Sequence, residues 1–394
     1  SGLVEMVGRT LGSNLVQNGD FSEIGTDLVQ NGTFNLGSEL VTSTSSTDNW
    51  INARGNSVLS VEGDTVRATI GSGSTFGIST AITTVIGKSY QINSTGVRSN
   101  SSGQFIMRVA NSANLSPAIY QDATLDDLTL TTSASFTATA TTTYVGFLAT
   151  LQSTGDYIET NSLSVKEVPD WTLGTGWSVE NNKAEFNGTT AAISQNIGLS
   201  SGKSYKIAFT LDVNQGGIAP VLGGSVQLNT ITTSGNHTVY GASGVNPLLY
   251  FQPVNFGGQD FQGSVTNIVV QELDPNDYWN LETGWSLGDN QAIKTGSVAS
   301  NFYQYSVFTT GQTYKLTFTI SNSNDGRLLV YVGGNSVTED IINTSDGTYT
   351  FYANSDNVNL VFRNVTFEGS ITNVTAQEVI DTNNIPRINY DSNG

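Results

Sequence analysis

The stretch that decides the fold is GKSYKIAFTLDV, Gly202–Val213, because apolar and polar side chains alternate along it. A period of two places successive side chains on opposite faces of a β-strand, so one face is buried and the other meets water. The pattern returns in GQTYKLTFTISN, Gly311–Asn322, and more weakly in GKSYQINSTGVR, Gly87–Arg98. The three copies therefore predict equivalent strands in three repeated units.

Two further motifs recur in the same order. FQGSVTNIVVQEL, Phe261–Leu273, returns as FEGSITNVTAQEV, Phe367–Val379, and more faintly as YIETNSLSVKEV, Tyr157–Val168. The glutamate near the end of each copy is residue 167, 272 or 378, so the copies lie 105 and 106 residues apart. All five Trp residues lie at the starts of units, in WTLGTGW (Trp171, Trp177), WNLETGW (Trp279, Trp285) and a lone Trp50. Motifs that keep their order and spacing indicate tandem domains.

Each unit has the size of one β-sandwich, and turn-forming Gly, Asn and Asp residues separate its short strand patterns. No amphipathic helix of three turns is apparent. We therefore expect an all-β protein of three tandem β-sandwich (jelly-roll) domains, preceded by a short strand-turn segment. The expected parts are an N-terminal segment at 1–41, domains at 42–169, 170–275 and 276–380, and a polar linker at 381–394. Pro169 and Pro275 mark the junctions, because proline cannot donate a hydrogen bond to a sheet.

A shorter repeat precedes the first domain. NLVQNGDF, Asn14–Phe21, is followed by DLVQNGTF, Asp27–Phe34, and then by SELV, Ser38–Val41. Such short strand-turn units cannot bury a core alone. We expect them to pack on the first sandwich or on another chain, as an attachment or oligomerisation segment. The residues expected to be buried in these assembly contacts are Leu15, Val16, Leu28 and Val29.

The composition excludes several classes of protein. The 394 residues carry 33 Asp and Glu but only 15 Lys and Arg, a net charge of −18, which disfavours nucleic-acid binding. No apolar run is long enough to cross a membrane as a helix. The absence of Cys excludes disulfides and thiolate sites, and the single His, His237, leaves Ser234 and Asp260 as its only conceivable triad partners. We interpret His237 as an exposed loop residue and the Asp/Glu clusters as solvated, and so expect no enzyme activity.

The repeats resemble a known type of module. The pattern of LVxNGxF followed by a Trp-containing segment is similar to the opening of carbohydrate-binding-module-like jelly rolls. The succession WTLGTGWSVENNKAEF, GKSYKIAFTL and GSVTNIVVQEL looks like copies of that module in tail-fibre and other virion proteins of tailed bacteriophages. The resemblance implies a jelly-roll fold, often with glycan binding and sometimes with a structural calcium ion. It does not imply that these copies bind sugar, because virion proteins frequently keep the sandwich as a spacer.

Candidate sites follow from differences between the copies. The second unit has an insertion, Asn255–Asp260, and we name Tyr240, Tyr250 and Phe256 as candidate glycan-binding residues in and near it. The Trp pairs recur at one structural position, which favours packing over sugar stacking. Asp20 and Glu23 are candidate calcium ligands, the alternative being that Asn18-Gly19 simply forms a turn.

We expect a structural component of a phage virion, namely a fibre, a tail appendage or a capsid decoration protein. Its expected partners are other virion proteins, further copies of itself and host-surface glycan, and its location is the extracellular particle. Two alternatives stay open. One is a secreted or surface bacterial glycan-binding adhesin, and the other is a set of non-catalytic modules from a polysaccharide-degrading enzyme.

Overall fold

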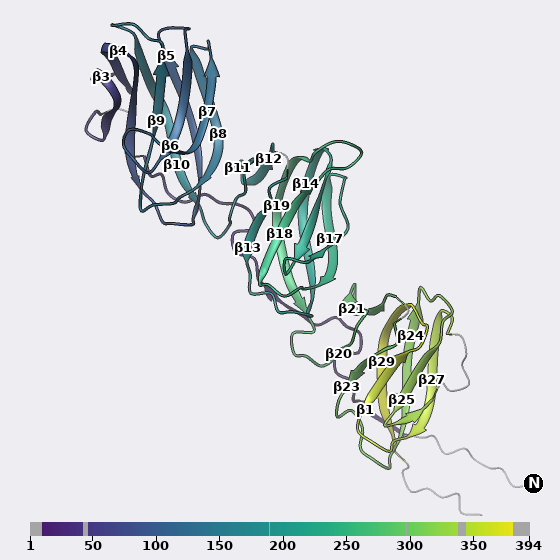
Figure 1. Ribbon diagram of the computed structural model, residues 1–394. Coiled ribbons are helices and arrows are strands. Elements are labelled where there is room, and N and C mark those ends of the chain that lie inside the picture. The colour runs from purple at the N-terminus through teal and green to yellow at the C-terminus, as the bar shows by residue number, and fades with distance from the viewer. Residues whose placement is uncertain (1–9, 42–45, 189, 297, 338–343, 381–394) are drawn as a thin grey trace, which may run out of the picture.

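The computed structural model describes residues 10–41, 46–188, 190–296, 298–337 and 344–380. These residues form strands and loops but no helix, so the all-β prediction is confirmed, and none of them forms a helix that could span a membrane. Three large hydrophobic cores lie in a row (Figure 1). We call the bodies around them module 1 (46–168), module 2 (171–273) and module 3 (279–380). Residues 1–9 and the expected linker 381–394 lie outside the described residues.

Module 2 consists of two antiparallel sheets packed face to face. The first has the order β11 (Trp177–Glu180), β12 (Lys183–Phe186), β19 (Gln262–Leu273), β14 (Ser204–Gln215) and β17 (Gly235–Ala242). The second has the order β13 (Ile193–Asn196), β18 (Leu248–Val254), β15 (Gly217–Leu222) and β16 (Val226–Gln227). Ile207 and Leu211 of β14 are fully buried between the sheets, as the alternation of that stretch predicts.

Module 3 repeats this arrangement with one additional short strand, β20 (Asn280–Leu281), in its second sheet. Its first sheet is β21 (Trp285–Gly288), β22 (Gln291–Lys294), β29 (Gly369–Ile380), β24 (Thr313–Ser321) and β27 (Gly347–Asn354). Its second sheet is β20 (Asn280–Leu281), β23 (Ser300–Gln304), β28 (Leu360–Asn364), β25 (Leu328–Val332) and β26 (Asn335–Ser336).

Module 1 joins its two layers through long strands. β3 (Trp50–Glu62) pairs with β4 (Thr65–Thr83), whose first part pairs with β10 and whose second part pairs with β9. The other strands are β5 (Ser89–Arg98), β6 (Gln104–Ala110), β7 (Ala118–Leu125), β8 (Thr129–Thr137), β9 (Thr142–Thr150) and β10 (Tyr157–Val168). Gly96 interrupts the alternation of β5 because a Cβ there would meet the Phe147 ring at 2.6 Å.

The N-terminal segment runs along all three modules in reverse order. We call residues 10–41 the strap. Its β1 (Thr10–Asn14) pairs with β29 of module 3, and its β2 (Ile24–Asp27) pairs with β19 of module 2. The amides of Gly37 and Leu40 then donate to the carbonyls of Glu167 and Val165 in module 1, at 2.8 and 2.9 Å. The chain thus travels from module 3 to module 1 before it returns through the module bodies.

Each of the first two strap repeats completes a core. Val16 and Phe21 are buried in module 3, where the Phe21 ring lies 5.3 Å from that of Trp279. Val29 and Phe34 are buried in module 2, where the Phe34 ring lies 5.0 Å from that of Trp171. In each module the indole nitrogen also donates to the carbonyl of a strap asparagine. The acceptors are Asn18, at 3.0 Å from Trp279, and Asn31, at 3.1 Å from Trp171.

The expectation that these repeats pack on the first sandwich is therefore wrong for the first two of them, and the described residues 10–41 pack along all three modules. The physical reason is that modules 2 and 3 each need an apolar pair over their first Trp. The strap supplies that pair from more than a hundred residues away: Phe34 is 137 residues before Trp171, and Phe21 is 258 residues before Trp279.

Val16 and Val29 are buried as expected, and Leu15 and Leu28 are half-buried against the same cores, so all four pack within this chain. An attachment role of the segment stays a prediction. Among the described strap residues, the third segment (38–41) packs on module 1, where Val41 is buried in the core of that module.

Candidate functional sites

The three expected glycan-binding residues do not come together. Tyr240 in β17 and Tyr250 in β18 belong to different sheets of module 2. Their strand neighbours Val239 and Phe251 pack in the core, so both tyrosines face outward from opposite sides of the sandwich. Tyr240 instead packs against module 3. The insertion folds into a small turn closed by Phe256 and Gln259, and the Phe256 side chain is 57% exposed there.

The turn that holds Asp20 and Glu23 is formed by backbone and side-chain hydrogen bonds. The Phe21 amide donates to the Asn18 carbonyl at 3.2 Å, and the Ser22 hydroxyl donates to Asp20 at 3.0 Å. Glu23 accepts from Asn276 of the loop between modules 2 and 3, at 2.9 Å. The described residues hold no group of three His, Cys, Asp or Glu side chains that could bind a metal. Calcium at Asp20 and Glu23 stays a prediction.

His237, Ser234 and Asp260 are engaged with different partners. The His237 ring nitrogen Nε2 lies 2.8 Å from the Thr233 carbonyl, and the Ser234 hydroxyl accepts from the Val213 amide at 2.8 Å. Asp260 accepts from the Asn255 side chain within the insertion. The three side chains do not form a triad.

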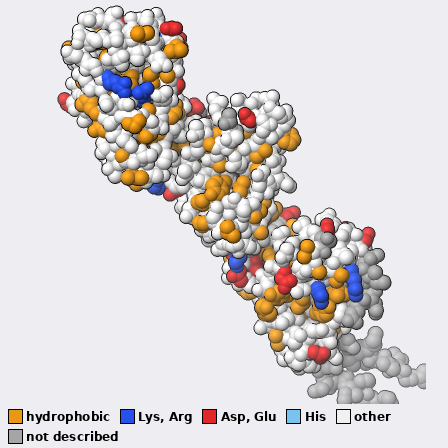
Figure 2. All heavy atoms as spheres, in the orientation of Figure 1, with side chains coloured by type: hydrophobic (Ala, Val, Ile, Leu, Met, Phe, Trp, Pro, Cys, Tyr) orange, Lys and Arg blue, Asp and Glu red, His pale blue; other side chains and the backbone are white. Residues whose placement is uncertain are grey.

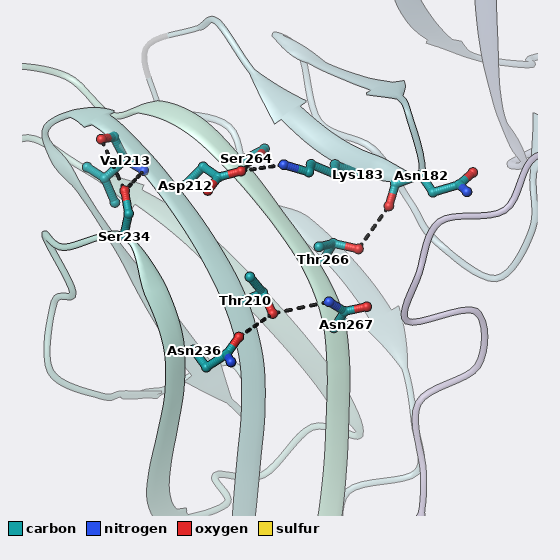
Figure 3. A network of polar contacts seen from close by, with 10 residues as sticks. All are labelled: Asn182, Lys183, Thr210, Asp212, Val213, Ser234, Asn236, Ser264, Thr266 and Asn267. Carbon is teal, nitrogen blue, oxygen red and sulfur yellow. Dashed lines mark hydrogen bonds and ion pairs between the residues drawn. The ribbon is translucent and has the colours of Figure 1, made fainter.

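A network of polar side chains covers the outer face of the first sheet in module 2 (Figure 3). Thr210 donates to Asn236 at 2.8 Å and accepts from Asn267 at 3.1 Å. Lys183 pairs with Asp212, and their hydrogen bond lowers the pKa of Asp212 and raises that of Lys183. The bonds join β12, β14, β17 and β19, so they act as a solvated cross-strand ladder.

A cleft of about 810 Å³ lies where modules 1 and 2 meet. Its described lining carries no charged side chain and includes the aromatic residues Tyr120, Phe136 and Trp177. Burial, with a smaller effect from Asp122, raises the pKa of Tyr120 to about 12. Beside the cleft, the Ser135 hydroxyl donates to the Trp177 carbonyl at 2.5 Å, so this junction is held by direct bonds.

A tyrosine face, whose Tyr303 and Tyr331 are half-buried, lies on the outer side of the second sheet of module 3. Tyr303, Val361 and Tyr331 face each other across β23, β28 and β25, so the two tyrosines lie roughly 10 Å apart, two strand spacings. The neighbouring row on the same face is Asn301, Arg363 and Leu329. Next to Tyr303 lies Tyr305, which is 57% exposed, with the two hydroxyl oxygens 3.3 Å apart.

This tyrosine face was missed in the sequence, although a signal for it exists. In β23 the residues alternate between buried and half-buried, which places Asn301 and Tyr303 on the outer face. The hydrogen bond from Tyr305, followed by burial, raises the pKa of Tyr303. In module 2 the equivalent row is Ser194, Tyr250 and Val221, with a single aromatic ring.

Solved structures of carbohydrate-binding modules and of a viral jelly-roll protein are similar to this chain at low TM-scores. No family model matches the chain, and no characterised protein matches it in sequence. A tandem pair of CBM22 modules from Xyn10C of Paenibacillus barcinonensis is similar with a TM-score of 0.29 and 8% identity, covering 60% of this chain and 98% of that one. A structure described as CBM4 is similar with a TM-score of 0.24 and 16% identity, covering 35% and 99% of the two chains. A triple jelly-roll turret protein of an archaeal virus has a TM-score of 0.21 and 14% identity, covering 87% and 89%. Each TM-score is below 0.5, so these likenesses carry no argument about this chain.

Proposed function

We propose that this chain is a non-enzymatic structural spacer of a bacteriophage virion, in a fibre, a tail appendage or a capsid decoration protein. The observation that carries the proposal is the strap, which contributes strands or backbone bonds to all three modules. A segment shared by every module resists bending at the junctions, because reorienting one module means breaking strand pairs in it. The resemblance of the succession WTLGTGWSVENNKAEF, GKSYKIAFTL and GSVTNIVVQEL to module copies in phage virion proteins supports the location in a particle.

The junctions add to this rigidity. Leu173 and Val179 at the start of module 2 donate their amides to Ser89 and Gln91 of module 1, at 3.0 and 2.7 Å. Between modules 2 and 3, the Leu287 amide of module 3 donates to the Ser204 hydroxyl of module 2 at 3.2 Å, and Lys203 of module 2 pairs with Asp277 of the connecting loop. Most of the surface in Figure 2 consists of uncharged side chains and backbone, with small groups of charges on each module. A stiff rod with few charges suits an extended protein that separates two attachment points.

Small-angle scattering tests the spacer directly. We expect a rod-like profile that one rigid conformation fits. A protease site inserted between Ser22 and Glu23, once cut, should make the junction of modules 2 and 3 flexible. The same site inserted between Gly257 and Gly258, in an open loop, should leave the profile unchanged when cut. A wild-type profile that needs many module orientations would contradict the proposal.

Immuno-electron microscopy of the virions that carry the encoding genome tests the location. Label on a fibre, an appendage or the capsid surface is the expected result, and intact virions without label would contradict it. An assay against a panel of polysaccharides should show no turnover. Turnover that is lost on changing a single carboxylate would contradict the non-enzymatic assignment.

A second candidate function, glycan binding, is favoured by the tyrosine face of module 3. Aromatic rings offer flat apolar surfaces, and Asn301 and Arg363 beside them supply hydrogen-bond donors. We expect glycan-array signals that the double change Tyr303→Ala with Tyr331→Ala abolishes. Tyr250→Ala, on the equivalent face of module 2, is the matched control and should keep full binding. An array without signals, or signals that survive the double change, would exclude this face as a binding site.

A further inference from the structure

Two arginines on the outer face of module 1 have no carboxylate partner. Arg108 lies in β6 between Ile106 and Ala110, which belong to a small apolar cluster outside the main core. Arg54 lies in the first part of β3. Neither guanidinium group forms an ion pair with a described residue. Unpaired neighbouring arginines are unexpected in a chain with a net charge of −18.

One loop holds the two side chains together. The Nε of Arg54 donates to the Asn114 carbonyl at 3.0 Å, and the Nη1 of Arg108 donates to the Leu115 carbonyl at 3.4 Å. Because the acceptors are consecutive carbonyls, the two guanidinium groups lie side by side. Burial, and then the positive charge of Arg54, lower the pKa of Arg108. Two like charges held this way repel each other, so the arrangement favours a bound anion.

The backbone on both sides of the pair is strained or irregular. The pairing of β3 with β4 shifts register before and after Arg54, and such a bulge re-aims a side chain. Gly55 follows with a φ of +73°, and a Cβ there would lie 2.7 Å from the Thr75 carbonyl oxygen. In the loop, Leu115 has a φ of 58°, which costs energy for a bulky side chain. Strain thus occurs in both segments that position the arginines.

The other two arginines of module 1 use their donors within the chain. Arg67 pairs with two glutamates, and Arg98 donates to four backbone carbonyls. A guanidinium group has five N–H donors, yet Arg54 and Arg108 each make a single hydrogen bond to a described residue. The Nε of Arg108 is buried without an acceptor among the described residues. The pair therefore has donors that this part of the chain does not satisfy.

The strands around the pair bring no free carboxylate to this face. β4, β6 and β9 contain no Asp or Glu, and the acidic residue of β3, Glu62, is already in an ion pair. Asp122 of β7 lies opposite Met107, a core residue, so it is on the inner face. The β7 residue opposite Arg108 is the neutral Gln121. An acidic group that binds here therefore comes from outside this face.

We propose that Arg54 and Arg108 form a binding site for one oxyanion group, a carboxylate or a phosphate, of a ligand outside this chain. The planar fork of a guanidinium group matches both kinds of oxyanion, because it donates two hydrogen bonds to two oxygens. The bound anion offsets the repulsion between the arginines and accepts from their free donors. The site lies on module 1 and is separate from the tyrosine face of module 3.

NMR of protein labelled with [15N]arginine tests the site, because the chain has only eight arginines. Inorganic phosphate is titrated at a constant ionic strength of about 0.15 M. The Nε–H signals of Arg54 and Arg108 should shift and saturate with one shared dissociation constant, whereas that of Arg67, which is paired with glutamates, should not move. No shift at the pair, shifts that do not saturate, or equal shifts at all arginines would overturn the proposal.

The variant Arg54→Gln tests whether the two arginines act together. It should weaken phosphate binding, measured at the Arg108 signal, at least tenfold, because a lone cation near the surface attracts an anion weakly. Lys206→Gln removes the same charge from module 2, where Lys206 forms no ion pair with a described residue, and should change the constant less than twofold. An unchanged constant in Arg54→Gln, or equal weakening in both variants, would contradict a paired site.

Two sugars determine which oxyanion the site prefers. Galacturonate carries one carboxylate, and galactose is its uncharged counterpart. Galacturonate should shift the Arg54 and Arg108 signals, and galactose should leave them unchanged. Tighter binding of galacturonate than of phosphate would assign a carboxylate ligand, and the reverse order would assign a phosphate ligand. Equal responses to galacturonate and galactose would overturn the assignment of an anion site.

Discussion

The first two repeats of the strap differ little in sequence, lie next to each other in the chain, and pack in two different modules. NLVQNGDF completes module 3, whereas DLVQNGTF completes module 2. Both use the same contacts, namely a buried Val, a buried Phe on a Trp ring, and a glutamine pair. The Gln17 backbone exchanges two hydrogen bonds with the Gln304 side chain, both at 2.9 Å, and the Gln30 backbone does the same with Gln195, at 2.8 and 2.7 Å.

This comparison teaches that position in the chain does not decide where a strand packs. The contacts outside the shared set differ between the repeats. Asn18 donates to Asp274 at 2.9 Å, whereas Asn31 donates to the Pro169 carbonyl at 3.3 Å. The strap contacts module 3 first, then module 2, then module 1, and the chain afterwards forms the modules in the opposite order. The predictions below test whether the two repeats are as independent as this arrangement requires.

Deleting residues 10–21 should have the largest effect. Module 3 would lose an edge strand together with buried Val16 and Phe21, at a cost of more than about 5 kcal/mol, much of the ~5–15 kcal/mol that stabilises a domain. Calorimetry should show the module 3 transition lost or strongly lowered while the other two persist. A deletion that lowers all three transitions equally would mean that the repeats are not module-specific.

Single ring truncations sharpen the comparison. Phe21→Ala and Phe34→Ala should each cost roughly 3–5 kcal/mol, because both side chains are at most 3% exposed and lie against a Trp ring. Urea unfolding followed by limited proteolysis should assign the Phe21 loss to module 3 and the Phe34 loss to module 2. Losses in the same module would contradict the assignment of the repeats.

The glutamine pairs should give smaller, matched effects. Gln304→Ala and Gln195→Ala each leave a strap amide and carbonyl without a side-chain partner, which should cost about 1–3 kcal/mol. Similar losses from the two variants, each confined to its own module, are expected in calorimetry. Substituting exposed Gln17 by Ala is the control and should be nearly neutral, since only its backbone takes part in the pair.

The junction of modules 1 and 2 should respond to alkaline pH. The pKa of Tyr120 is raised to about 12, so the folded protein holds this proton more tightly than the unfolded chain, where tyrosine titrates near 10. The corresponding stability is present below pH 10 and is lost as the pH rises towards 12. Wild-type protein should lose more stability in that window than Tyr120→Phe. Parallel pH profiles for the two proteins would show that Tyr120 does not titrate this way.

Much of the fold was predictable because the period-two pattern of β14 and β24 determines which face is buried. The Trp residues were correctly expected to pack, since Trp171, Trp177, Trp279 and Trp285 all lie in cores. The path of the strap was not predictable from local pattern, because a Val and a Phe in a short repeat fit any module with a vacant Trp face. The structure keeps the candidate glycan-binding residues apart for a related reason. Tyr240 and Tyr250 are close in sequence, yet a strand change places them on opposite sides of one sandwich.

The reversed order of the strap is tested most directly by disulfide trapping in this cysteine-free chain. Leu11 lies opposite Val379 in the pairing of β1 with β29, so Leu11→Cys with Val379→Cys should close a disulfide within one monomer. Val168 stands at the matching end of β10 in module 1, and Leu11→Cys with Val168→Cys should stay reduced. Gel mobility and peptide mapping under oxidising conditions show whether the disulfide has formed in each of the two variants. Efficient closure of the Leu11–Val168 variant, or Leu11–Val379 bonds that form only between chains, would contradict the path of the strap.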